Sequence, residues 1–136
     1  MFPSASTSAP YMTGEVILPA TTLVERCYEY MFSYVNISNL TVKIMATDID
    51  YPQSMSNMFR MHRNVLSDNK AKVYVSFTEW PSDETVLEDW FRTNSDLQDK
   101  GTFYKPESLS TEFNLNRIPY YTRSTPYVKN WEVVDY

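Results

Sequence analysis

Three carboxylates stand where a metal-dependent reaction could be built. Asp48 and Asp50 lie at the end of a predicted strand over 40–49, and Glu79 lies near the end of the next predicted strand, over 71–80. Open α/β sheets bind ligands at the carboxyl ends of their strands, and carboxylate oxygens suit hard divalent cations. One hypothesis is therefore a metal-dependent hydrolase or nuclease. The simpler interpretation is that aspartates end strands and begin turns, so we assign no metal ligand.

Other catalytic chemistry has little support in the residues. Cys27 is the only cysteine and His62 the only histidine, and both fall on apolar faces of predicted helices. A nucleophile must lie beside its base, and nothing in the sequence places these two together. The two glycines leave no glycine-rich phosphate loop or dinucleotide fingerprint, and no G-x-S-x-G turn is present. We therefore expect no catalytic residues and no cofactor.

An acidic stretch runs from Glu79 to Asp99, where seven acidic residues are opposed by Arg92 alone. Such a face can steer a basic partner protein toward its binding site. The simpler interpretation, which we favour, is the solvated side of a helix. The residues of this predicted acidic face are Glu79, Asp83, Glu84, Glu88 and Asp89.

The last 36 residues, 101–136, hold five of the eleven tyrosines. Tyrosine and tryptophan combine a large apolar area with a polar tip, and protein interfaces are enriched in both. The alternatives are that these rings complete the domain's own sheet, or that they stack on bases. Four basic and four acidic residues share this segment, a balance that does not favour nucleic acid. The predicted interface anchors are Tyr104, Tyr120, Tyr121, Tyr127 and Trp131.

Apolar periodicity predicts strands and helices in alternation. Thr22 and Glu25 form a capping box, and apolar residues then recur at helical spacing; Val73 and Val75 alternate with Lys72 in a strand pattern. The predicted helices cover 22–35, 54–66 and 82–93. The predicted strands cover 15–18, 40–49, 71–80, 113–118 and 128–134.

These elements predict one domain of the α+β (or α/β) class. It would consist of a single small sheet with about three covering helices and a β-rich aromatic C-terminal segment. The alternative is a mostly-β sandwich in which the helices are over-predicted. The single domain would span 1–136, with 1–10 as a flexible or extended arm and 101–136 as the aromatic segment. No internal repeat is visible.

The composition limits the classes of partner that the chain is expected to bind. The formal net charge is -5 without a dense basic cluster, which disfavours nucleic acid. No signal peptide and no apolar run long enough to cross a membrane is visible, so we expect no membrane partner and an intracellular or virion-associated protein. Other protein subunits, its own copies or different chains, are the expected partners, in an oligomer or larger assembly.

Few glycines and many Tyr, Ser, Thr and Asn residues give the chain a composition similar to that of virion structural proteins, such as capsid, neck and tail components. The leading hypothesis is thus a non-catalytic structural protein that assembles through protein–protein interfaces. The first alternative is a small acidic inhibitor or adaptor that binds a basic partner. The second is the metal-dependent enzyme that would use Asp48, Asp50 and Glu79.

Overall fold

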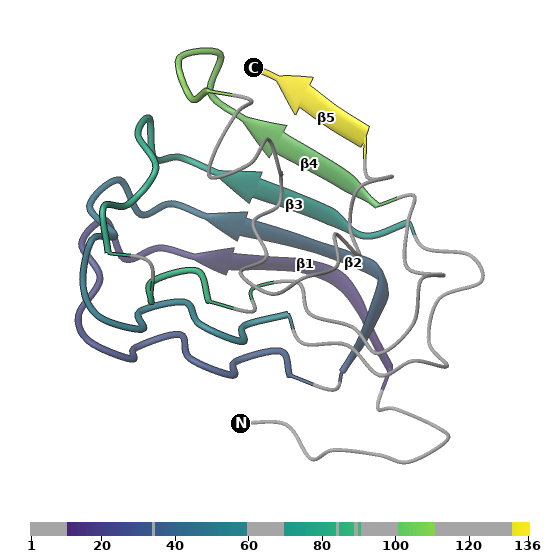
Figure 1. Ribbon diagram of the computed structural model, residues 1–136. Helices are drawn as coiled ribbons and strands as arrows, with labels where there is room; N and C mark the ends of the chain where they lie inside the picture. Colours follow the sequence, from purple (N-terminus) through teal and green to yellow (C-terminus); the bar gives the residue numbers. More distant parts are fainter. Residues whose placement is uncertain are drawn as a thin grey trace.

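The fold is a single sheet of five parallel strands that neighbour one another in chain order (Figure 1). The computed structural model describes residues 11–33, 35–59, 70–83, 85–88, 90, 101–110 and 132–136. The strands are β1 (Tyr11–Leu18), β2 (Asn36–Ile44), β3 (Lys72–Val75), β4 (Thr102–Lys105) and β5 (Glu132–Asp135).

Parallel neighbours in chain order require the chain to return to the same end of the sheet after every strand. The structure is therefore a solenoid, and each coil supplies one strand. One row of register partners crosses all five strands, and its successive members lie 26, 31, 30 and 30 residues apart along the chain. These spacings give the lengths of the coils. The members of this row are Val16, Val42, Val73, Phe103 and Val133.

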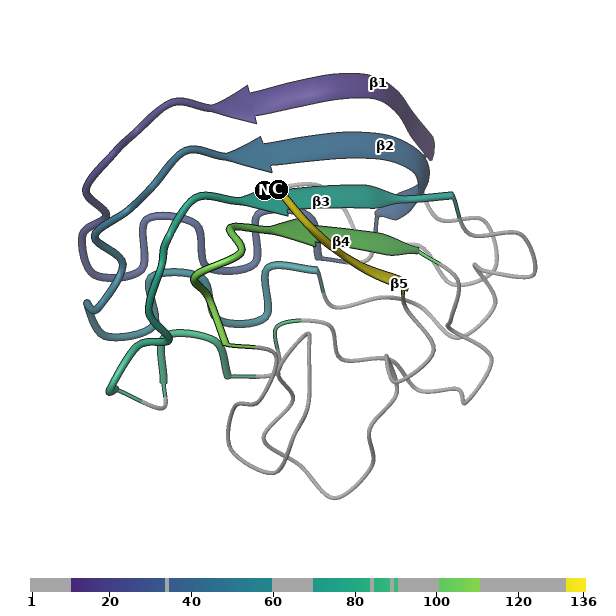
Figure 2. The same cartoon turned by 90° about the horizontal axis from the view of Figure 1, so that it is seen from above.

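The connections between the first four strands run back along one face of the sheet as stacked, wavy segments (Figures 1 and 2). The described residues of 21–33, 48–59 and 83–90 form what we call the tandem-turn layer. Alternate N–H groups close turns within a segment, as when Glu29 donates to the Arg26 carbonyl at 3.3 Å. The intervening N–H groups donate to the next coil, as when Tyr28 donates to the Ser54 carbonyl at 2.9 Å. Every N–H from 26 to 33 is satisfied in this way.

Left-handed backbone recurs every fourth residue in this layer. Arg26 and Tyr30 have φ of 58° in the first segment, and Gln53 and Asn57 have φ of 54° and 51° in the second. A turn pattern that repeats every four residues places apolar side chains on one side at almost the 3.6-residue period of an α-helix. The layer thus imitates the sequence pattern of a helix without its backbone.

The predicted α+β (or α/β) class with three covering helices is wrong. The described residues contain no helix, and the stretches predicted as helices over 22–35, 54–66 and 82–93 contribute, where described, to the tandem-turn layer. The sandwich alternative is also wrong, because these residues form one all-parallel sheet.

Four of the predicted strands overlap β1, β2, β3 and β5, whereas β4 was not predicted as a strand. The predicted strand over 113–118 and the predicted arm over 1–10 lie outside the described residues.

The core fills the space between the sheet and the tandem-turn layer. Aromatic rings form a buried ladder through it: Phe32 stacks on Phe59 with centroids 5.6 Å apart, and Phe59 lies 5.9 Å from Trp90. Trp90 then meets Phe103 of β4 edge-on at 5.9 Å, which joins the layer to the sheet. Three coils and the sheet are therefore packed through one continuous set of rings, each of which buries a large apolar area.

The last strand is anchored by a buried lysine. Lys105 of β4 is only 1% exposed, and its Nζ lies 2.5 Å from Asp135 Oδ1 of β5 and 2.6 Å from the Leu109 carbonyl. A buried ammonium group requires a counter-charge. The inward side of β5 therefore carries a carboxylate opposite Lys105, whereas β2 and β3 carry the apolar residues Ile44 and Val75 on their inward side.

Phe59→Ala is expected to lower the free energy of unfolding by about 3–5 kcal/mol, because it removes the central ring of the buried ladder. Urea denaturation would measure the loss. Val24→Ala is the control, since Val24 is 62% exposed and its truncation should change stability by less than about 0.5 kcal/mol. Equal losses in the two variants would contradict the ladder's role.

Asp135→Asn is expected to lower the free energy of unfolding by about 2 kcal/mol, because it leaves the Lys105 ammonium buried without its counter-charge. The effect is below that of a fully buried pair because the Asp135 side chain is half exposed to solvent. Thermal unfolding beside Glu132→Gln, a substitution of an exposed carboxylate in the same strand, checks this. A Glu132→Gln effect as large as that of Asp135→Asn would speak against the anchor.

Candidate interaction surface

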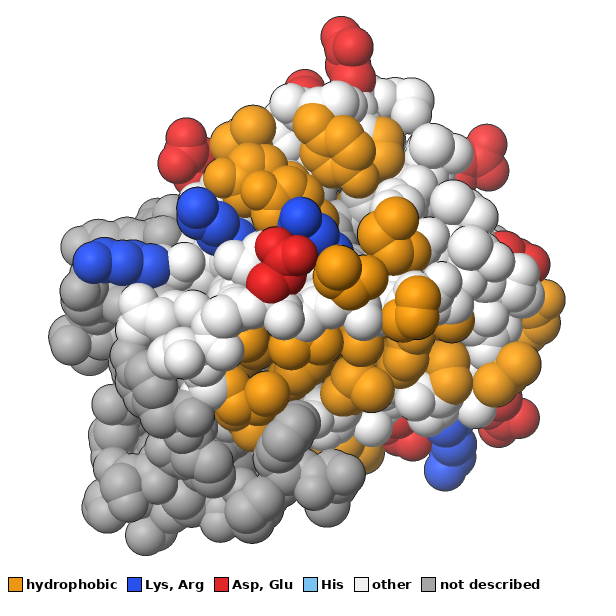
Figure 3. Space-filling model, turned by 180° about the vertical axis from the view of Figure 1, so that it is seen from behind, with side chains coloured by type: hydrophobic (Ala, Val, Ile, Leu, Met, Phe, Trp, Pro, Cys, Tyr) orange, Lys and Arg blue, Asp and Glu red, His pale blue; other side chains and the backbone are white. Residues whose placement is uncertain are grey.

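The sheet has one covered and one uncovered face within the described part of the chain. All-parallel sheets usually have both faces covered, and their strands are then apolar throughout. Here the strands alternate instead: Val73 and Val75 of β3 are buried under the tandem-turn layer, while Lys72 and Tyr74 point to the opposite side. We call that opposite side, seen in Figure 3, the outer face.

Two register rows of side chains cross the outer face from β1 to β5. The first is polar and consists of Glu15, Thr41, Lys72, Thr102 and Glu132. The second is mainly apolar and aromatic and consists of Ile17, Lys43, Tyr74, Tyr104 and Val134.

Two tyrosines stack at the centre of the second row. The rings of Tyr74 and Tyr104 are 4.1 Å apart and inclined by only 3°. The Lys43 ammonium lies 5.4 Å from the Tyr74 centroid, from the strand on the other side of β3. The two faces of the Tyr74 ring are therefore occupied by Lys43 and Tyr104. Tyr136 approaches the same ring at 6.3 Å and 50°.

The surroundings keep the Tyr74 hydroxyl protonated. Burial raises the pKa of Tyr74, and the hydrogen bond with Tyr104 and the negative charge of Glu15 raise it further. Glu15 also lies 3.2 Å from the Lys43 ammonium. The centre of the face thus presents the neutral phenol of Tyr74 beside a neutralised ion pair.

Exposed apolar side chains surround this stack. Ile17 is 54% exposed, Met45, just after β2, is 43% exposed, and Tyr136 is 57% exposed. Figure 3 shows hydrophobic side chains spread over much of this face with a few charged groups among them. We call Ile17, Met45, Tyr74, Tyr104 and Tyr136 the outer-face patch.

Only one predicted interface anchor can be compared with this patch. Tyr104 belongs to it, whereas Tyr120, Tyr121, Tyr127 and Trp131 lie outside the described residues. Ile17, Met45, Tyr74 and Tyr136 were not predicted. The alternation of residues along β3 did place Tyr74 on the side opposite Val73 and Val75. This alternation is the sequence signal that could have identified Tyr74 as a surface residue.

The predicted acidic face is only partly described, since Glu84 and Asp89 lie outside the described residues. Glu79 is exposed. The Asp83 carboxylate accepts hydrogen bonds from the N–H and the hydroxyl of Thr85, at 2.9 and 2.7 Å. Asp83 is therefore used within the fold, and Glu88 is half-buried.

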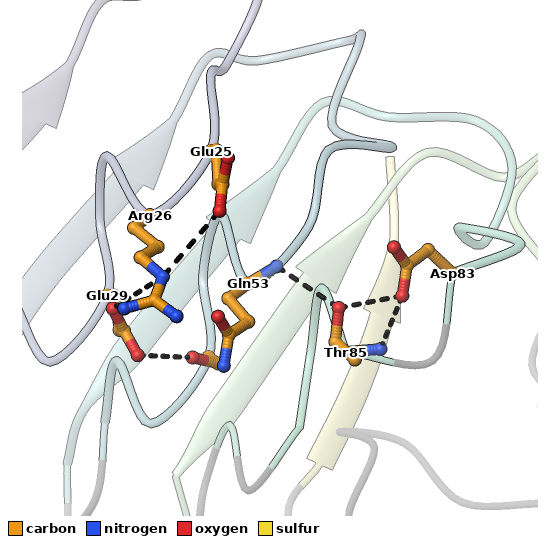
Figure 4. A network of polar contacts seen from close by, with 7 residues as sticks. Glu25, Arg26, Glu29, Gln53, Asp83 and Thr85 are labelled. Carbon is orange, nitrogen blue, oxygen red and sulfur yellow. Dashed lines mark hydrogen bonds and ion pairs between the residues drawn. The ribbon is translucent and has the colours of Figure 1, made fainter.

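Thr85 extends this contact into a polar network that crosses the three segments of the tandem-turn layer (Figure 4). Its hydroxyl accepts from the Gln53 N–H at 3.2 Å. In the preceding coils Glu29 accepts from the Ser56 hydroxyl at 3.4 Å and lies 3.9 Å from Arg26. These contacts join each coil to the next.

The carboxylates of the metal hypothesis have separate partners. Asp50 accepts from the Ser82 hydroxyl at 2.6 Å and from the Asp83 N–H at 3.0 Å, and Asp48 accepts from the Tyr51 hydroxyl at 3.3 Å. Among the described residues, which include Glu79, no three His, Cys, Asp or Glu side chains lie together as a metal site would require.

The other residues considered for chemistry have ordinary structural surroundings where they are described. Cys27 is exposed, and its thiol donates to the Ser54 carbonyl at 3.9 Å; His62 lies outside the described residues. Met55 and Met58 are fully buried and belong to the core. Within the ranges the structure describes, no helix is long and apolar enough to cross a membrane.

Asp50→Asn is expected to destabilise the protein at neutral pH and to become equal to the wild type in acid. Hydrogen bonds from Ser82 and then Asp83 lower the pKa of Asp50. A lowered carboxyl pKa gives stability that is present above the ordinary carboxyl range and is lost as the pH falls through the lowered value.

Unfolding midpoints measured from pH 7 downward would show the two curves converging in that acid range. Glu79→Gln, at an exposed carboxylate, should behave like the wild type. An Asp50→Asn difference that persists unchanged in acid would contradict the role of these hydrogen bonds.

Comparison with known proteins gives no relative from which a function could be transferred. The chain matches no protein-family model, no curated protein and no solved structure. A functional proposal for this chain must therefore rest on the geometry of the outer face.

Proposed function

We propose that this protein is a non-catalytic structural protein that assembles with other protein subunits, its own copies first, through the outer-face patch. The observation that carries the proposal is the exposure of tyrosine, methionine and isoleucine side chains on the face of the parallel sheet that the described residues leave uncovered. Exposed apolar groups gathered on one face are typical of protein interaction sites.

The stacking of the tyrosines favours a protein partner over a base or a sugar ring. A nucleobase binds an aromatic side chain through a free ring face, and both faces of Tyr74 are already covered, by Lys43 and Tyr104. Beside this stack the patch offers the exposed ring of Tyr136 and the aliphatic surfaces of Ile17 and Met45. Protein interfaces bury this mixture at their centres.

The charges around the patch also suit a protein surface. Glu15 and Lys43 neutralise each other at 3.2 Å, so burial of the patch would desolvate an ion pair that is already formed. The formal net charge of -5 opposes the approach of a phosphate backbone. A virion component such as a capsid, neck or tail protein is one setting for such a subunit, and the composition supports it.

The test is self-association measured by light scattering coupled to gel filtration, over a wide range of concentration. We expect the wild-type mass to rise above the 16.0 kDa of one chain. Ile17→Lys and Met45→Lys place a charge in the patch at exposed positions, and each should weaken association at least about tenfold, or 1.4 kcal/mol.

Val24→Lys is the matched control, because Val24 is an exposed apolar residue in the tandem-turn layer. It should associate like the wild type. A wild-type chain that stays at 16.0 kDa at every concentration contradicts self-assembly, and equal effects of all three lysine substitutions remove the patch as the interface.

A further inference from the structure

The last strand contributes little apolar burial to the fold. Glu132, Val133, Asp135 and Tyr136 are exposed, and Val134 is half-buried. The strand is held by its backbone pairing with β4 and by two side chains at its end. Its attachment therefore depends on specific contacts rather than on hydrophobic packing.

The first of these contacts is an ion pair. Lys105 points to the inner side of β4 and is almost completely buried, and its ammonium group pairs with the Asp135 carboxylate. Carbonyl oxygens of Leu109 and Pro106 accept from the same group, at 2.6 and 3.4 Å. Carbonyls solvate the ammonium group without cancelling its charge, so a strand that docks here must bring an acid opposite Lys105.

The second contact is the terminal tyrosine. The Tyr136 N–H donates to the Lys105 carbonyl at 2.9 Å, and its own carbonyl accepts from the Glu107 N–H at 3.1 Å. Its hydroxyl donates to the Val75 carbonyl of β3. Tyr136 thus reaches past β4 and fixes the register of the strand on the sheet.

We propose that the edge of β4 is a docking site for an extended strand with this acid and this tyrosine, and that a second copy of the chain supplies it by exchange of its C-terminal strand. Exchange of an identical element keeps every contact described above and creates a dimer at little cost. The proposal rests on the proposed function in taking another copy as the partner.

The length of the chain permits the exchange. Residues 111–131 join Ser110 to Glu132, and 21 residues can span at most about 70 Å when extended. That reach exceeds the distance across several strands of a sheet at about 4.8 Å each. Reciprocal exchange gives a closed pair, whereas exchange in one direction builds an open chain of subunits.

The experiment is disulfide trapping between two full-length variants, each with Cys27→Ser. One carries Thr102→Cys and the other Glu132→Cys, two outward positions that are register partners in β4 and β5. After the chains are mixed and incubated at high concentration below the unfolding midpoint, mild oxidation should join them into a covalent heterodimer, because these cysteines become register partners when the strand of one chain pairs with the sheet of the other.

The matched control replaces Glu132→Cys with Val134→Cys, which lies two residues out of register with Thr102. Strand exchange predicts at least tenfold more heterodimer for the registered pair. Equal yields would mean that the outer faces meet without exchange, and no covalent dimer would mean that the strand stays on its own chain; either result overturns the proposal. Addition of Asp135→Lys to the Glu132→Cys chain should remove at least nine-tenths of the product.

A second measurement uses the unmodified chain and therefore does not depend on how the variants fold. Chains with normal and heavy nitrogen are mixed, and a carbodiimide joins amines to carboxylates in contact. Exchange predicts Lys105–Asp135 peptide pairs of mixed isotope in the mass spectrum, and pairs of a single isotope only would exclude it. Association by light scattering without mixed pairs would leave the outer-face proposal standing and remove this one.

Discussion

Everything in this structure depends on hydrogen bonding from each coil to the next. In the sheet the bonds form a parallel ladder, and in the first two segments of the tandem-turn layer alternate N–H groups donate to the next coil. A coil on its own would leave those groups unpaired, at a cost comparable to that of the bonds themselves. The coils can be stable only as a stack, and the buried aromatic ladder packs along that same stack.

The sequence predicts parts of this arrangement well. The alternation of apolar and polar residues identified β3 and showed which of its residues face the core, because a strand has a period of two wherever one face is buried. It failed for the tandem-turn layer, where left-handed residues at Arg26 and Tyr30 produce a period near that of a helix. Neither residue type marks that conformation, which glycine and asparagine adopt most readily. Asn57 is the one conventional signal among the four.

The candidate site was less predictable because it is made by register. Tyr74 and Tyr104 are 30 residues apart in the chain and meet because they are register partners in the parallel pairing of β3 with β4. No repeat is visible in the sequence, because only the burial pattern repeats from coil to coil. Val16, Val42 and Val73 mark that repeat, whereas the residues around these valines differ between coils. Lys105 would have been placed on a solvated face, as lysine almost always is, and only the position of Asp135 explains its burial.

The hydrogen bonds of the tandem-turn layer also have a direction. Alternate N–H groups of 26–32 donate to carbonyls of 52–58, and those of Met55, Asn57 and Phe59 donate to carbonyls of Val86, Glu88 and Trp90, so the dipoles of these peptide groups add along the axis of the stack. Aligned peptide dipoles give partial charges at the two ends, as in an α-helix. The end of the layer beside β1 has carbonyl character and the opposite end amide character. The stack is thus polar along its length, and its two ends would attract charges of opposite sign.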